Sequence, residues 1–196
     1  KRNTKAHRIR KNKKKLGRSI EERPKEVENR QEFGHWEADL VVGQKSGNDQ
    51  VLLTLVERKS REYWMLPIKN RHADSVMEAF QTLQGIYSEH FSQVFKTITT
   101  DNGSEFSRLS ELEELAETLV FYTHPYTSCE KGTNERHNGI IRRFIPKGKR
   151  ISDFDVDYIA DIEVWCNSLP RKILNYRTPD EVFEDELDLI YRQTAS

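Results

Sequence analysis

Three acidic residues that are far apart in the sequence have the chemistry to hold divalent cations together: Asp39, Asp101 and Glu135. Asp39 lies in the apolar run at residues 35–43, and Asp101 directly follows a predicted short strand at residues 95–100. Glu135 lies in the first turn of a predicted basic helix. Mg²⁺ takes oxygen ligands and accepts only a few of them from the protein. The three carboxylates therefore predict a metal site, provided that the fold brings them together.

Each of these acids also has a plainer explanation. Asp39 could face solvent from an edge strand, Asp101 could be an ordinary Asp-Asn-Gly turn residue, and Glu135 could interact with a helix dipole. The surroundings of Glu135 favour the metal site, because it is the only acid in residues 131–150, which contain seven Lys and Arg residues. A lone acid in such a stretch fits a salt-bridge partner, but also a metal ligand beside a phosphate backbone.

The basic residues around Glu135 are candidates for contacts with nucleic-acid phosphates, and a solvated charged helix face is the alternative explanation. Arg142 lies seven residues after Glu135, which places it two turns along the same face of the helix. His137, Ile141 and Phe144 fall on a different stripe that is suited to packing against a sheet. The predicted DNA-binding residues are Lys131, Arg136, Arg142, Arg143 and Lys147.

The elements that must position these residues follow from the hydrophobic pattern. Three apolar runs with short polar links predict an antiparallel meander, and the later pattern alternates between helices and short strands. The expected strands cover residues 35–43, 50–57, 62–68, 95–100 and 120–122, and the expected helices cover residues 73–91, 108–119, 134–144 and about 158–169. This order predicts an α/β fold with a five-stranded mixed sheet, first antiparallel and then parallel, and helices on both faces. Ligand sites in such sheets lie at the carboxyl ends of central strands.

Charge is distributed unevenly along the chain. Of the 32 Lys and Arg residues, ten lie in residues 1–20, which contain no acid, and the other 22 share the rest of the chain with all 32 acidic residues. We expect residues 1–30 to form a basic arm or linker, with compact structure from about Phe33 and one domain with a C-terminal helical extension over residues 31–196. A polyanion partner for the arm and a solvated linker are both open explanations. Two cysteines indicate a reducing, cytoplasmic setting, and no apolar run approaches the roughly 18 residues of a membrane span.

Several motifs in order resemble the DDE transposases and retroviral integrases, and most closely the bacterial insertion-sequence transposases of the IS-thirty family. The resemblance covers roughly residues 20–185, and it depends on the sequence as a whole, because any one motif is weakly specific. The motifs that carry it are Gly-His-Trp-Glu-Ala-Asp-Leu at residues 34–40, Thr-Asp-Asn-Gly-Ser-Glu-Phe at 100–106, Lys-Gly-Thr-Asn-Glu at 131–135, Asn-Gly-Ile-Ile-Arg at 138–142, Phe-Ile-Pro-Lys-Gly at 144–148 and Leu-Asn-Tyr-Arg-Thr-Pro at 174–179.

The resemblance implies an RNase H-like catalytic core in which Asp39, Asp101 and Glu135 are both the catalytic and the metal-binding residues. Two Mg²⁺ ions, for which Mn²⁺ can substitute, would lie about 3.5–4 Å apart as in other two-metal sites. It implies cleavage at transposon ends and transfer of the 3′-OH ends into target DNA, by at least a dimer, in the bacterial cytoplasm at the nucleoid. Two alternatives stay open: an RNase H-like nuclease that cleaves without joining, and a non-catalytic DNA-binding module.

Overall fold

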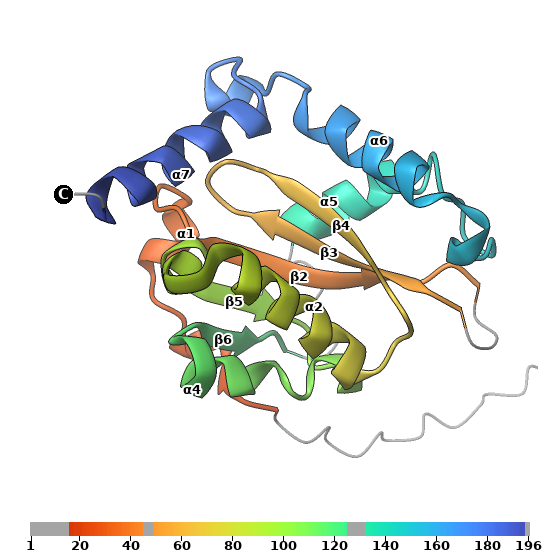
Figure 1. The fold of residues 1–196 in the computed structure, drawn as a ribbon, viewed down its shortest axis with the longest axis horizontal. Coiled ribbons are helices and arrows are strands. Elements are labelled where there is room, and N and C mark those ends of the chain that lie inside the picture. The colour runs from red at the N-terminus through yellow and green to blue at the C-terminus, as the bar shows by residue number, and fades with distance from the viewer. Residues whose placement is uncertain (1–15, 45–48, 125–131, 195–196) are drawn as a thin grey trace, which may run out of the picture.

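The computed structural model describes residues 16–44, 49–124 and 132–194, and within them the centre of the protein is a mixed sheet of six strands. The strand order is β1-β6-β5-β2-β3-β4, with the antiparallel meander on one side and parallel strands on the other (Figure 1). The strands are β1 (Arg18–Ser19), β2 (His35–Val41), β3 (Val51–Glu57), β4 (Tyr63–Ile68), β5 (Thr97–Thr100) and β6 (Leu119–Tyr122). The predicted five strands and their mixed arrangement are confirmed, and β1 is added to the edge.

Strand β1 belongs to a segment in which the sequence predicted no structure. It pairs in parallel with β6, with Arg18 opposite Phe121 and Ser19 opposite Tyr122. Ser19 and Glu22 then form a capping box on a short 3₁₀ helix, Ile20–Glu22. Compact structure thus begins well before Phe33, contrary to expectation, because elements this short leave no hydrophobic periodicity. Residues 1–15 of the predicted arm lie outside the described part of the chain.

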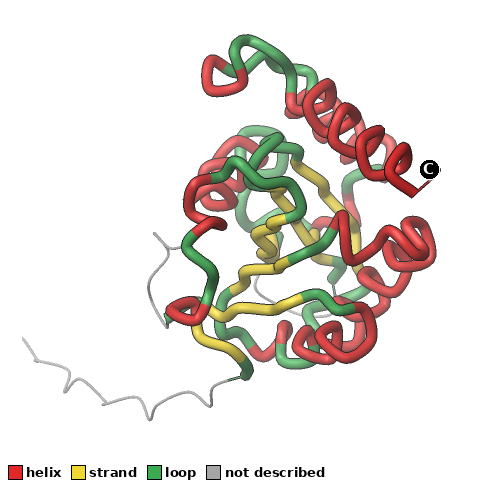
Figure 2. Tube along the Cα trace, turned by 90° about the vertical axis from the view of Figure 1, so that its left-hand side faces the viewer, coloured by secondary structure: helices red, strands yellow, loops and turns green. Residues whose placement is uncertain are grey.

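Helices cover both faces of the sheet, so that the strands form a central layer in Figure 2. The α-helices are α1 (Glu26–Asn29), α2 (Ala73–Tyr87), α3 (Phe91–Val94), α4 (Leu112–Ala116), α5 (Gly132–Ile141), α6 (Val156–Asn167) and α7 (Pro179–Thr194). Further 3₁₀ helices cover Ser88–His90, Ser104–Phe106, Leu109–Glu111, Ile151–Asp153 and Lys172–Leu174. Among the described residues, none of these helices has both the length and the apolar character that crossing a membrane requires.

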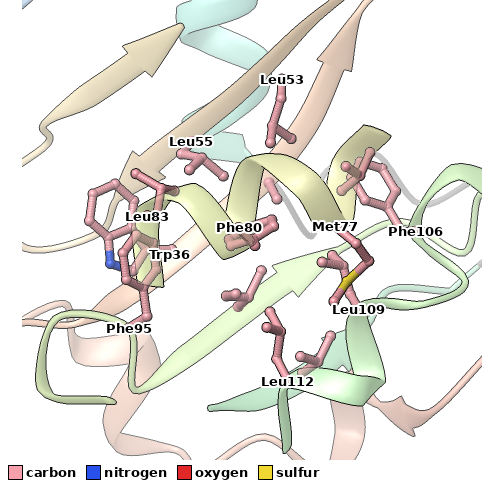
Figure 3. Close-up of a cluster of buried hydrophobic side chains, with 14 of the residues drawn as sticks. Trp36, Leu53, Leu55, Met77, Phe80, Leu83, Phe95, Phe106, Leu109 and Leu112 are labelled. Atoms are coloured by element: carbon pink, nitrogen blue, oxygen red, sulfur yellow. The ribbon is translucent and has the colours of Figure 1, made fainter. Parts of the chain in front are cut away.

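The core between the sheet and α2 is large and rich in aromatic residues (Figure 3). Trp36 and Ala38 of β2 point into it, and the Trp36 ring stacks on Phe95 with centroids 4.8 Å apart. Phe183 of α7 also packs on Trp36, so the C-terminal helix is part of this core. Because side chains alternate along a strand, this arrangement directs the odd-numbered residues of β2 to the opposite face.

The opposite face packs against α5 and α6. Val41 of β2 lies in this second core with Ile141 near the end of α5 and Ile162 of α6. His137 is buried and its ring stacks on Tyr63 at 4.9 Å, so the predicted packing stripe of the basic helix is seen in the structure. The face of β2 that carries Asp39 is therefore the face that α5 covers.

Two predicted helices are shorter than expected. The helix expected over residues 73–91 is interrupted at Ser88, which has a positive φ of 48°, and continues as a 3₁₀ turn and then α3. The helix expected over residues 108–119 is a 3₁₀ turn followed by α4, which ends at Glu117 with φ of 56°. Leucines spaced three or four residues apart can face the same core from a 3₁₀ turn or from an α-helix. Their spacing therefore did not distinguish the two kinds of helix.

Candidate active site

Asp39 lies on β2, and Asp101 directly follows β5, the parallel neighbour of β2. The register pairs His35 with Thr97 and Glu37 with Thr99, and each aspartate lies two residues further along its chain, at the carboxyl end of β5. The side chains of this ladder share one face of the sheet, as shown by the 2.9 Å contact between His35 Nδ1 and Thr97 Oγ1. Both aspartates are half-buried. They therefore combine a fixed backbone with access to solvent.

Hydrogen bonds orient both carboxylates. Asp39 Oδ1 accepts from the Leu40 amide at 3.0 Å, and Asp39 Oδ2 accepts from Asn138 Nδ2 at 2.9 Å. Asp101 Oδ1 accepts from the Gly103 amide at 2.8 Å, which closes a turn immediately after β5. These hydrogen bonds fix the direction in which each carboxylate points.

Gly103 lets the chain turn tightly around Asp101. A Cβ at this position would lie 2.7 Å from Asp101 Oδ1 and 2.7 Å from the carboxylate of Glu105. A side chain there would displace both acids. Glu105 is buried and is held by Arg71, whose Nε donates to its Oε1 at 2.9 Å. The turn therefore brings a second, neutralised carboxylate close to Asp101, which sequence reasoning had not singled out.

Helix α5 is tied to the sheet on both sides of Glu135. The Asn134 amide donates to Glu37 Oε2 at 3.0 Å, and Asn138 donates to Asp39 as described above. Thr54 Oγ1 of β3 donates to Asn134 Oδ1 at 3.2 Å, and the Tyr63 hydroxyl donates to Asn138 Oδ1 at 3.0 Å.

The Glu135 side chain lies outside what the structure describes, but its backbone occupies the first turn of α5. Residues three apart lie on the same side of a helix, so Glu135 is on the side of α5 from which Asn138 reaches Asp39. Among the described side chains, no group of three or more His, Cys, Asp or Glu residues could hold a metal ion. The three-acid site therefore stays a prediction, which the backbone positions favour.

The predicted DNA-binding residues have different surroundings. Arg136 and Arg143 are exposed on α5 and just after it, and Lys147 is exposed in the following loop. Arg142 is half-buried, and its Nη2 donates to the Val42 carbonyl at 2.8 Å. Burial lowers the pKa of the Arg142 guanidinium. Arg142 thus holds the end of β2, a contact that helical spacing did not predict, and Lys131 lies outside the described residues.

Sequence signals existed for several supporting residues. Thr54 is the one polar residue in the otherwise apolar run at residues 51–56, and the structure buries it completely. Glu37 is an acid two residues before Asp39, so both side chains lie on the same face of the strand. Polar residues of this kind in buried strands are expected to have partners, because an unpaired buried polar group is unfavourable.

The fold is RNase H-like. The structure aligns with the crystal structure of the catalytic core domain of BIV integrase with a TM-score of 0.57, covering 81% of this chain and 98% of that one at 18% identity. The sequence matches the integrase core domain family over residues 29–128. The chain therefore belongs to the integrase core domain family.

Relatives in this family are transposases of insertion sequences. The chain is 41% identical over 172 residues to the probable transposase for insertion-like sequence element IS1161 of Streptococcus salivarius, covering 88% of this chain and 48% of that protein. It is 36% identical over 166 residues to the transposase for insertion sequence element IS4351 of Bacteroides fragilis, covering 84% and 49%. These relatives confirm the resemblance seen in the sequence motifs. The chain spans about half the length of the curated relatives it matches.

Proposed function

We propose that this chain is the catalytic core of a DNA transposase. It would cleave the strand at transposon ends and transfer the 3′-OH ends into target DNA. The observations that support the proposal are the parallel pairing of β2 with β5, the strands that lead to Asp39 and Asp101, and the hydrogen bond by which Asn138 joins Asp39 to the helix that bears Glu135. The family and the insertion-sequence relatives support the same reaction class.

The donor set suits Mg²⁺, because the half-buried Asp39 and Asp101 offer oriented carboxylate oxygens at the carboxyl end of the parallel strands. Asp39, Asp101 and Glu135 would hold two Mg²⁺ ions, or Mn²⁺ in their place. Such ions supply activation of a water or 3′-hydroxyl and stabilisation of the leaving oxygen. The protein's own contribution is positioning: Asn138 fixes the Asp39 carboxylate and the Gly103 turn fixes Asp101.

The exposed strip of α5 and the turn after it is the proposed surface for the DNA backbone. Arg136, Gly139 and Arg143 are exposed at intervals of three and four residues, which places them on one side of the helix. A Cβ at Gly139 would meet no atom within 4 Å, so a nucleic-acid strand can approach the helix backbone there. Arg136 and Arg143 flank this gap with charges for phosphates, and Lys147 extends the charge beyond the helix.

A transposition reaction joins two element ends, so the active assembly is at least a dimer of the full protein. Its DNA partners are the element ends and the target duplex, which places the protein at the nucleoid in the bacterial cytoplasm. The two rival functions stay open to experiment: a nuclease that cleaves without joining, and a DNA-binding module without catalysis.

The deciding experiment supplies labelled element ends and a target duplex with Mg²⁺. A transposase gives cleaved and joined products, a simple nuclease gives only cleaved ones, and a binding module gives neither. The Asp39→Asn, Asp101→Asn and Glu135→Gln variants should lose cleavage while retaining DNA binding. Asp161→Asn, an exposed acid on α6, is the matched control and should keep full activity. Undiminished cleavage by any of the first three variants would remove that residue from the site.

A second test measures the metal without any DNA. A ligand that binds only the folded state raises stability, by about 2.7 kcal/mol at a hundred times its dissociation constant. Mn²⁺ or Mg²⁺ should raise the melting temperature of the protein and of the Asp161→Asn control. It should not raise the melting temperature of Asp39→Asn or Asp101→Asn.

A further inference from the structure

Glu37 is a buried acid whose carboxylate lies between a buried arginine and the first turn of α5. Its side chain is 1% exposed. Oε1 pairs with Arg58 Nη1 at 2.5 Å, and Oε2 accepts from the Asn134 amide at 3.0 Å. The Glu37 carbonyl also accepts from Asn134 Nδ2 at 3.2 Å. Both the main chain and the side chain of Glu37 therefore hold the residue that precedes Glu135.

The contact between Glu37 and Asn134 lies in the first turn of α5, where it can fix the start of the helix. The helix begins at Gly132, and the N–H groups of a first helical turn have no partner within the helix. A carboxylate at this end of a helix is also stabilised by the helix dipole. Glycines at 132 and 139 weaken the intrinsic stability of α5, so its location depends on contacts of this kind with the sheet.

The contacts of Glu37 and Arg58 continue to residues 23–28, the segment through which the chain enters the domain. Arg58 Nε donates to the Val27 carbonyl at 3.3 Å, and Arg58 Nη2 donates to Glu28 at 3.3 Å. The other oxygen of Glu28 pairs with Arg23, and Arg23 Nη1 donates to Thr99 Oγ1 at 2.9 Å. Residues 23–28 are thus connected through Arg58 and Glu37 to the first turn of α5, and through Thr99 to the strand that ends before Asp101.

We propose that Glu37 is a positioning residue that fixes the start of α5, and so the location of Glu135, and that residues 23–28 act on it through Arg58. The inference rests on the proposed function for its catalytic meaning. The contacts themselves extend from the chain's entry into the domain to the predicted metal site. A change in the entering segment is therefore transmitted to the helix that carries Glu135.

The test compares two buried glutamates on neighbouring strands. Glu57 of β3 is fully buried, and it accepts from the Gly34, Lys59 and Ser60 amides and the Ser60 hydroxyl, none of which belongs to α5. Glu37→Gln and Glu57→Gln therefore make the same substitution at two buried positions, of which only the first contacts α5. Amide hydrogen exchange over residues 132–141 is measured on the full protein for both variants, and global stability is followed by urea unfolding.

Glu37→Gln should raise exchange over residues 132–141 roughly tenfold or more relative to Glu57→Gln, the factor expected when a hydrogen bond to a charged group is lost. It should also raise the Mg²⁺ concentration for half-maximal cleavage by a similar factor. Equal exchange in the two variants, after correction for global stability, would overturn the positioning role.

The connection from residues 23–28 through Arg58 to Glu37 is tested separately at Glu28. Its side chain is 60% exposed, and its replacement leaves the core intact. Glu28→Gln should raise exchange in α5 by a smaller factor than Glu37→Gln does, and the double variant should show less than the product of the two factors. Unchanged exchange in α5 for Glu28→Gln would overturn the link. If the wild-type protein cleaves no DNA, the proposed function fails, whereas the exchange measurements still decide whether Glu37 positions α5.

Discussion

Asn138 Nδ2 donates a hydrogen bond of 2.9 Å to Asp39 Oδ2, and this bond joins α5 directly to the acid of β2. The Asn138 oxygen accepts in turn from the Tyr63 hydroxyl at 3.0 Å. This partner fixes which end of the amide faces Asp39, so that the NH₂ group donates. Asp39 is therefore oriented by the same helix that carries Glu135.

Asn138→Ala should lower the rate of strand cleavage. The change removes the donor that orients Asp39, and loss of such a supporting contact typically costs about 10–100-fold in metal affinity or activity. DNA binding should be retained, because Asn138 is not on the exposed strip. Asn70→Ala removes the Asn70 side chain that accepts from the His72 amide at 3.0 Å, beside the start of α2, and is the control. A similar loss of cleavage in both variants would argue against a specific role for Asn138.

Gly139→Ala should separate helix stability from DNA contact. Ala is more favourable than Gly within a helix by about 1 kcal/mol, and a Cβ at Gly139 has open space, so the protein should become more stable. DNA affinity should fall, because the added methyl group occupies the proposed approach of the strand. Gly85→Ala in α2 also has open space and should stabilise the protein without affecting DNA binding. Unchanged DNA affinity in Gly139→Ala would count against the proposed DNA surface.

Arg142 and Arg143 are adjacent in sequence but should behave differently when replaced. Arg143→Ala should reduce the slope of log affinity against log salt by about 1, as expected for one lost phosphate contact. Arg142→Ala should instead lower the free energy of unfolding, by about 1–3 kcal/mol, because the Val42 carbonyl loses a charged donor. Salt titrations of DNA binding and urea unfolding distinguish the two effects. Equal salt slopes for the two variants would contradict this assignment.

Glu62 should make the stability of the protein depend on pH. Burial, and then the charge of Asp180 on α7, raise the pKa of Glu62 to about 8, and burial raises the pKa of Glu163 on α6 to about 7. The pKa of these carboxyl groups is lower in the unfolded chain than in the folded protein. At a pH between the two values, the folded state keeps protons that the unfolded state has released. Stability should be greatest below the unfolded pKa and should fall as pH rises through about 8.

Glu62→Gln tests this effect, because the amide oxygen can still accept from Trp64 Nε1 and Asn167 Nδ2. The variant should be more stable than the wild type at pH 8.5, by roughly 2 kcal/mol, and the difference should shrink at pH 5. Urea unfolding at the two pH values gives the measurement, with the exposed Glu114→Gln as the control. A stability difference between variant and wild type that is larger at pH 5 than at pH 8.5 would contradict the predicted pH dependence.

Much of the architecture could be predicted from the sequence, because its signals are local. Side chains alternate along a strand and repeat every three or four residues along a helix, so short windows indicate the meander, α2, α5 and α6. The turn residues after Thr100 likewise predicted that Asp101 directly follows a strand. Local signals failed where elements are shorter than one period, as in β1 and α1, and where a helix breaks at Ser88.

The sequence by itself predicted which residues carry the chemistry, and it determined the kinds of elements that hold them and the family motifs. Only the tertiary structure decided that β5 pairs in parallel with β2, that Asn138 reaches Asp39, and that Arg142 binds the Val42 carbonyl. These contacts join residues 62–100 positions apart, and they form only when both faces of the sheet are packed. Strand register and helix docking minimise the free energy of the whole domain, so no short stretch of sequence contains them.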